Sequence, residues 1–320
     1  GRYLGFSLAP FKRPKRLYTI MVFLLTVFLV SYFTYYALSH DNAASPALSI
    51  LAALLVIIPC SEFALTLTNT IVNHIFTPTM LPKLELKTGI PEELATFVIV
   101  PTLLTSTAGA VDLISQLEVY YLANREKNLF FALVGDFKDA PSQEQKKDEA
   151  IIKTALEEIA ELNRKYSGNG PGIFYYMHRK RVFNAAENRW MGWERKRGAI
   201  AEFNRLLRGD PDTGFTICSG DVSLLPAIGY VITLDADTNL PMGAARRLIG
   251  TIAHPLNRAS IDKERGLVRE GYGLIQPRIC VSITASNCSY FTKIFAGQGG
   301  LDPYTTAVSD IYQDIFDEGI

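Results

Sequence analysis

Two aspartates, Asp235 and Asp237, stand one residue apart directly after an apolar, β-branched run at 230–234. Such a run predicts a buried strand, which delivers both carboxylates at its C-terminal end. In α/β folds, ligands bind beside the C-terminal ends of parallel strands. Two carboxylates placed in this way can hold one hard divalent cation, Mg²⁺ or Mn²⁺, which commonly binds phosphate oxygens as well. The pair therefore predicts a metal and phosphate site.

Two classes of enzyme use such a pair. In nucleotide-sugar transferases the metal neutralises a departing nucleoside diphosphate. In haloacid-dehalogenase-type phosphatases the first Asp is phosphorylated and the second is the acid and base, roles that Asp235 and Asp237 would take. That phosphatase motif normally opens its domain and precedes a Gly-Asp motif, but here it lies far into the α/β region and no Gly-Asp follows it. The transferase interpretation is therefore favoured.

Further polar residues lie close to expected strand ends and helix starts. Asp136 falls at the end of an apolar run, where a carboxylate could accept the N–H of uracil or could simply form a turn or helix cap. Residues 195–197 are three consecutive cations before Gly198. Cations oppose the dipole at a helix start, which favours an anionic partner such as a diphosphate, although a solvated patch or a membrane headgroup would also suit them. Trp190 and Trp193 flank this point and could stack on a base or sugar ring, or pack.

An acceptor site is expected beside the last predicted strand, at 274–281. Gln276 and Arg278 lie on it, and their amide and guanidinium groups suit sugar hydroxyl groups and phosphate.

Apolar runs and helical periodicities alternate after residue 92, which predicts an α/β domain with a mainly parallel sheet and flanking helices. The first strand is expected to end at Pro101. The expected strands are 96–104, 128–137, 173–178, 230–234 and 274–281, and the expected helices are 110–124, 142–166, 195–207 and 243–253.

Two apolar segments near the N-terminus, 18–39 and 47–67, are each long enough to cross a lipid bilayer. Four cations at 12–16 precede the first segment, whereas the link between the segments has no Lys or Arg, so both ends of this hairpin are expected in the cytoplasm. The expected parts are a basic flank (1–16), a transmembrane hairpin (17–69), an interfacial linker (70–91) and a catalytic domain (92–320).

Composition excludes one class of partner. The chain has 320 residues with 32 basic and 32 acidic side chains, and a balanced chain without a clustered basic excess is not expected to bind nucleic acid. The four cysteines show no metal-ligand spacing, which indicates reduced thiols.

From residue 86 to 319 the chain resembles the glycosyltransferase region of the cyclic β-1,2-glucan synthases, a family of inverting enzymes with a GT-A fold. The paired apolar segments ending in Pro-Cys-Ser-Glu at 59–62 are similar to the part that precedes this region. The matching segments are 98–105, 117–124, 191–198, 230–238, 253–258, 271–278, 302–305 and 312–314.

This resemblance implies UDP-glucose as the donor, Mg²⁺ or Mn²⁺ as the cofactor and a β-1,2-linked glucan as acceptor and product, made at a bacterial inner membrane. It implies the following roles: Pro101, Thr102 and Asp136 around the uridine, Arg197, Gly198 and Asp235 at the donor, and Asp237, with Asp235, at the metal.

Family members are much longer, so the chain, which runs from Gly1 to Ile320, is expected to be a fragment whose parent polypeptide carries further domains. The resemblance implies that the general base lies beyond this sequence; within the sequence, Asp317 and Glu318 are the candidates for that role. Two alternatives stay open: synthesis of another β-glucan, and a non-catalytic module that binds nucleotide sugars.

Overall fold

The computed structural model describes residues 15–40, 46–75, 80–168, 172–277, 289 and 315–316. The chain divides into two compact units, Leu81–Ile275 on one hand and Gly1–Met80 with Gln276–Ile320 on the other.

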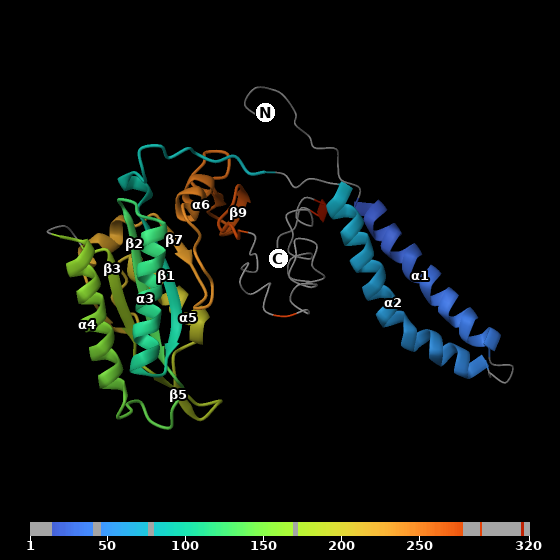
Figure 1. Ribbon diagram of the computed structural model, residues 1–320, viewed down its shortest axis with the longest axis horizontal. Coiled ribbons are helices and arrows are strands. Elements are labelled where there is room, and N and C mark those ends of the chain that lie inside the picture. Colours follow the sequence, from blue (N-terminus) through green and yellow to red (C-terminus); the bar gives the residue numbers. More distant parts are fainter. Residues whose placement is uncertain are drawn as a thin grey trace. The chain divides into compact units, whose positions relative to one another are not determined.

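The unit that includes Gly1–Met80 contains two long apolar helices, α1 (Lys15–His40) and α2 (Pro46–Ile75). They pack against each other as a hairpin (Figure 1). Their segments Lys15–Ser39 and Ile50–Val72 have mean hydropathies of 2.1 and 2.3, and 0% and 11% of their most apolar windows are buried. Helices with so little burial are not the core of a soluble domain, so both are candidate membrane spans. α2 runs through Pro59 and reaches Ile75, beyond the predicted end of the hairpin.

The unit Leu81–Ile275, which we call the α/β unit, is built on a five-stranded sheet in the order β6-β3-β2-β1-β7. β1, β2, β3 and β7 are parallel, and β6 runs antiparallel to β3. The predicted mainly parallel α/β fold is confirmed. The strands are β1 (Thr96–Leu104), β2 (Leu129–Phe137), β3 (Phe174–Arg179), β6 (Phe215–Cys218) and β7 (Tyr230–Thr233).

Helices cover both faces of the sheet (Figure 1). The apolar core on one face includes residues of α3 (Thr107–Ala123), α4 (Asp148–Tyr166) and α6 (Ala244–Ile252). The core on the other face includes residues of α5 (Arg195–Leu207) and of the short 3₁₀ helix η3 (Val222–Ala227). Because both faces are covered, all nine residues of β2 are buried, as expected of a parallel strand within a layered domain.

β1 spans the whole predicted range, Thr96–Leu104, and continues past Pro101, which was expected to end the strand. The Ile99 carbonyl accepts a hydrogen bond from the Leu234 N–H, so the odd-numbered residues of β1 direct their backbone groups toward β7. β7 ends at Thr233, opposite Ile99, so the missing N–H of Pro101 costs no ladder hydrogen bond. β1 therefore extends past its neighbour.

Other differences from the predicted elements have local causes. α4 begins at Asp148 and not at residue 142, because the Asp148 carboxylate accepts a hydrogen bond from the Gln145 N–H and closes a turn there. Residues 274–277 are not a strand, and the rest of the predicted strand, 278–281, lies outside the described residues. β6 and two small hairpins were not predicted; the hairpins pair β4 (Val182–Asn184) with β5 (Arg189–Met191) and β8 (Ser260–Asp262) with β9 (Leu267–Glu270).

The segment before the sheet also packs on the α/β unit. Ile90 is buried in the core that contains α3 and α4, and Leu84 donates a backbone hydrogen bond of 2.9 Å to Gly250 of α6. The 3₁₀ turn η2 (Glu92–Leu94) then leads into β1. Residues predicted as an interfacial linker are thus, from residue 84 onward, part of the α/β unit.

Candidate functional site

The two aspartates after β7 lie where the winding of the sheet reverses. β1 leads through α3 to β2 on one side, whereas β7 pairs with β1 on its other side. Open α/β sheets bind ligands beside the carboxyl ends of strands at such a reversal. Asp235 and Asp237 are both exposed there. The predicted metal ligands therefore occupy a preferred ligand position of this class of fold.

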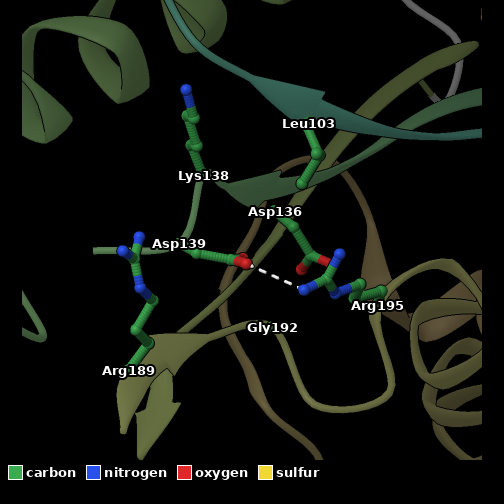
Figure 2. Close-up of a pocket in the computed structure, with 7 residues that line it drawn as sticks. All are labelled: Leu103, Asp136, Lys138, Asp139, Arg189, Gly192 and Arg195. Atoms are coloured by element: carbon green, nitrogen blue, oxygen red, sulfur yellow. Dashed lines mark hydrogen bonds and ion pairs between the residues drawn. The ribbon is translucent and has the colours of Figure 1, made fainter. Parts of the chain in front are cut away.

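A cavity of about 230 Å³ opens at the ends of β1 and β2, and we call it the strand-end cavity (Figure 2). Its charged side chains have both signs, and an Arg195–Asp139 ion pair of 3.0 Å crosses one side of it. Both acids and bases can therefore contact a bound molecule here. The cavity is lined by Leu103, Asp136, Lys138, Asp139, Arg189, Gly192 and Arg195.

A buried arginine organises the wall of this cavity. Arg179, the last residue of β3, is 1% exposed, and its Nε and Nη2 both donate to the carboxylate of Asp136. Nη1 donates to Glu202 Oε2 at 2.9 Å and to the Trp193 carbonyl at 3.0 Å. Nη2 also donates to the Arg195 carbonyl at 2.9 Å. All five N–H groups of the guanidinium are thus satisfied, which a buried charge requires.

The turn that Arg179 holds is strained. Glu194 and Arg195 have φ angles of 51° and 48°, in the left-handed region that residues with a Cβ rarely adopt. A Cβ on Gly198 would lie 1.9 Å from the Trp193 carbonyl oxygen, so only glycine fits at this position of α5. The bonds from Arg179 to two carbonyl groups of this turn keep it in place at the start of the helix.

The same turn connects the strand-end cavity with the aspartates. Arg195 lines the cavity, and the ammonium group of the next residue, Lys196, forms an ion pair with Asp235. Arg197 is mostly exposed and pairs with Glu194 at 3.6 Å. The basic segment and the acidic pair, which are about forty positions apart in the sequence, are therefore adjacent in space.

Asp237 is held near a buried tyrosine. The Tyr120 hydroxyl donates to the Thr238 carbonyl, which ties α3 to the loop after β7. Burial, together with the negative charge of Asp237, raises the pKa of Tyr120 to about 12. Tyr120 therefore stays protonated and can act as the donor that fixes this loop.

Asp235 and Asp237 fit a divalent cation whose remaining ligands come from a substrate. Their oxygens are the donors that Mg²⁺ and Mn²⁺ prefer, and the ammonium group on Asp235 shows that positive charge is stabilised there. Within the described ranges, no three His, Cys, Asp or Glu side chains gather into a metal cluster. Mg²⁺ is commonly held by one or two carboxylates plus phosphate oxygens, so two ligands suffice when a diphosphate supplies the others.

The other predicted site residues are placed as follows. Pro101 and Thr102 lie near the carboxyl end of β1, and Asp136 lies near that of β2. Gln276 is exposed and irregular in conformation. Arg278, Asp317 and Glu318 lie outside the described residues.

Sequence reasoning missed the residues that support the site, above all Arg179 and Glu202. Glu202 is 8% exposed and also accepts a hydrogen bond of 3.1 Å from the Gly214 N–H. A cation at the end of a predicted strand was the one available signal for Arg179. The partner of that cation, Asp136, is 43 positions away in the sequence.

A buried histidine lies on the opposite face of β3. His178 is 1% exposed, its Nδ1 lies 2.8 Å from the Tyr176 hydroxyl, and its Nε2 has no hydrogen-bond partner among the described residues. Its ring centroid lies 4.0 Å from that of Phe137. Burial lowers the pKa of His178 to about 4. The imidazole is therefore neutral in the folded chain at neutral pH.

Acid should destabilise the fold through this histidine. Between about pH 6.5 and about pH 4 the unfolded chain binds a proton at this position and the folded chain does not, so the free energy of unfolding falls as the pH falls. The loss should reach about 3 kcal/mol near pH 4. Chemical unfolding in detergent across this range measures it, and His178→Phe should flatten the profile. An equally steep profile in this variant would contradict the assignment.

Comparison with known proteins adds one match. No family model matches the chain. The chain is 42% identical over 267 residues to the cyclic β-(1,2)-glucan synthase NdvB of Rhizobium meliloti (strain 1021). The aligned part is 83% of this chain and 9% of that protein, so the chain spans less than a tenth of the relative it matches.

Proposed function

Because the chain belongs to the cyclic β-(1,2)-glucan synthase family, we propose that it is the region that binds UDP-glucose and a divalent cation for the synthesis of a β-1,2-linked glucan. One observation carries this proposal. Arg195 lines the strand-end cavity, and the next residue, Lys196, pairs with Asp235. The region proposed for the nucleotide and the region proposed for the diphosphate are therefore adjacent. An α/β unit of the GT-A type would place a donor in this position.

The residues of the site have separate roles in this proposal. Pro101, Thr102 and Asp136 lie beside the uridine, with the Asp136 carboxylate fixed by Arg179. The basic segment 195–197 with Gly198 lies beside the diphosphate, where its positive charge at the start of α5 favours an anion. Bound Mg²⁺ or Mn²⁺ would neutralise the charge on the departing UDP. Asp235 and Asp237 would hold that cation.

Lys196 and a bound cation would compete for Asp235. Without a cation, Lys196 neutralises Asp235. If Asp235 instead held a cation, the Lys196 ammonium group could pair with a phosphate oxygen.

A β-linkage from an α-linked donor requires inversion by single displacement, and hence a general base beside the acceptor hydroxyl. Among the described residues of the strand-end cavity, Asp136 is engaged by Arg179 and Asp139 by Arg195. We therefore propose that this chain binds the donor and transfers glucose slowly or not at all, and that segments of the longer family members complete the acceptor side, where Gln276 and Arg278 would contact the glucan.

One experiment distinguishes the proposed donor binding from the alternative phosphatase activity. The purified chain in detergent with Mn²⁺ is incubated with radiolabelled UDP-glucose and β-1,2-gluco-oligosaccharides, and in parallel with p-nitrophenyl phosphate. The proposal expects specific retention of UDP-glucose, little elongation and no phosphatase activity. Release of p-nitrophenol that depends on Asp235 would overturn it in favour of the phosphatase. Rapid elongation would show that the base lies within these residues.

The proposed membrane placement makes a testable prediction of its own. If α1 and α2 cross the bilayer with the 12–16 cations in the cytoplasm, a reporter inserted within residues 41–45 should report an extracytoplasmic position. A reporter inserted after Lys87 should report a cytoplasmic one, where nucleotide sugars are available. The reverse pattern would remove the α/β unit from its donor and contradict the proposed function.

A further inference from the structure

A second and larger hollow lies beside the strand-end cavity. The β4–β5 hairpin pairs Phe183 with Trp190, whose ring centroids are 5.6 Å apart, and a groove of about 510 Å³ opens between this hairpin and the turn that precedes α5. Its size lies within the ~300–1,000 Å³ typical of small-ligand pockets. We call it the hairpin groove, and its wall includes Phe183, Asn184, Glu187, Trp193, Glu194 and Arg195.

Two aromatic side chains that line this groove are about half exposed. Phe183 is 51% exposed and Trp193 is 48% exposed. Trp193 follows Gly192 in the turn held by Arg179, which bonds the Trp193 carbonyl and so fixes where its side chain starts. Rigid, amphipathic aromatic faces in a concave site suit a ligand that has both apolar C–H faces and polar edges. A pyranose ring has both.

The charges of the groove favour a neutral ligand. Glu187 pairs with Arg195 at 3.1 Å, and Glu194 pairs with Arg197 at 3.6 Å. Because these acids and bases neutralise one another, the groove carries no excess positive charge for a nucleotide or an anionic lipid headgroup. Carboxylate and guanidinium groups side by side remain good acceptors and donors for hydroxyl groups.

The groove shares one wall residue with the donor side of the site. Arg195 lines both the strand-end cavity and the hairpin groove. We propose that the hairpin groove binds a segment of β-linked gluco-oligosaccharide, with pyranose rings on Trp193 and Phe183 and hydroxyl groups on Glu187 and Arg195. This inference rests on the proposed function, since it takes the glucan of that reaction as the occupant.

The test is calorimetric titration of the whole chain in detergent with β-1,2-linked gluco-oligosaccharides. Trp193→Ala and Phe183→Ala should each weaken binding about tenfold, because each removes one stacking face. Trp193→Phe, which keeps an aromatic face, should stay close to wild type. Leu122→Ala, at an exposed apolar position of α3, is the matched control and should also bind like wild type.

Titration with UDP and Mn²⁺ in the same samples separates the two proposals. If UDP binds but the oligosaccharides do not, the hairpin groove is not a glucan site and the proposed function stands. The same holds if UDP binds and the oligosaccharides bind all variants with equal affinity. If the oligosaccharides bind in a Trp193-dependent way while UDP fails to bind, the groove is a carbohydrate site and the proposed donor site is wrong. Displacement of the oligosaccharide by UDP alone would show that the groove belongs to the nucleotide, and would overturn the inference.

Discussion

Asp237→Ala is expected to abolish Mn²⁺-dependent binding of UDP, with a loss in affinity of about 100-fold or more. Asp237 is exposed at the point where the sheet reverses its winding, and with Asp235 it supplies the two protein ligands of the proposed cation. Removing one of two anionic ligands leaves the diphosphate charge uncompensated. Calorimetric titration of the detergent-solubilised variant with UDP, in Mn²⁺ and in chelator, measures the effect.

Two variants control this experiment. Asp112→Ala removes an exposed acid from α3 and should bind UDP and Mn²⁺ like wild type. Asp136→Asn should weaken the affinity for uridine while leaving the dependence on Mn²⁺ intact, because Asp136 lies in the strand-end cavity and not beside the aspartate pair. If Asp237→Ala binds UDP and metal as wild type does, both aspartates are structural.

Arg179→Met is expected to lower the free energy of unfolding by about 3–5 kcal/mol, because it leaves buried acidic groups without their cation. Asp136 and Glu202 are 5% and 8% exposed, and both accept hydrogen bonds from Arg179. The strained turn at Glu194 and Arg195 loses two bonds to its carbonyl groups as well. Chemical unfolding followed by circular dichroism measures the change, and UDP affinity should fall with it.

Arg205→Met is the matched control for this arginine. Arg205 lies on α5 and forms an exposed ion pair with Asp210, so its loss should leave the unfolding midpoint close to that of wild type. Arg179→Lys keeps the charge but lacks the planar fork, and should recover part of the stability. If Arg179→Met unfolds like Arg205→Met, the buried network does not support the site.

The parts of the fold that could be predicted are those with a strong local signal. The apolar, β-branched run before Asp235 predicted β7 to within one residue, because such residues favour strands. The prediction that this strand is buried was wrong: β7 lies at the edge of the sheet and is only partly buried. α5 begins and ends at the predicted residues, Arg195 and Leu207. Long apolar stretches likewise predicted α1 and α2. In each case one short segment carries the information.

The parts that could not be predicted depend on long-range contacts. The extension of β1 past Pro101 depends on where β7 ends, more than a hundred positions later. The ion pairs of Arg179 join β3 to β2 and to α5, and no local pattern specifies them. The edge strand β6 is short and only partly buried, so its periodicity is weak. Asp235 and Asp237 were recognisable by spacing, whereas the contact of Lys196 with Asp235 required the fold.

The most direct test of the central claim is the affinity of the wild-type chain for UDP-glucose in detergent, measured by calorimetry with Mn²⁺ and again with a chelator. The proposed site predicts saturable binding in Mn²⁺ and a large loss of affinity when the cation is removed, because the two carboxylates then repel the diphosphate. Binding of equal strength with and without the cation, or no binding in its presence, would contradict the assignment of Asp235 and Asp237 to a metal-dependent donor site.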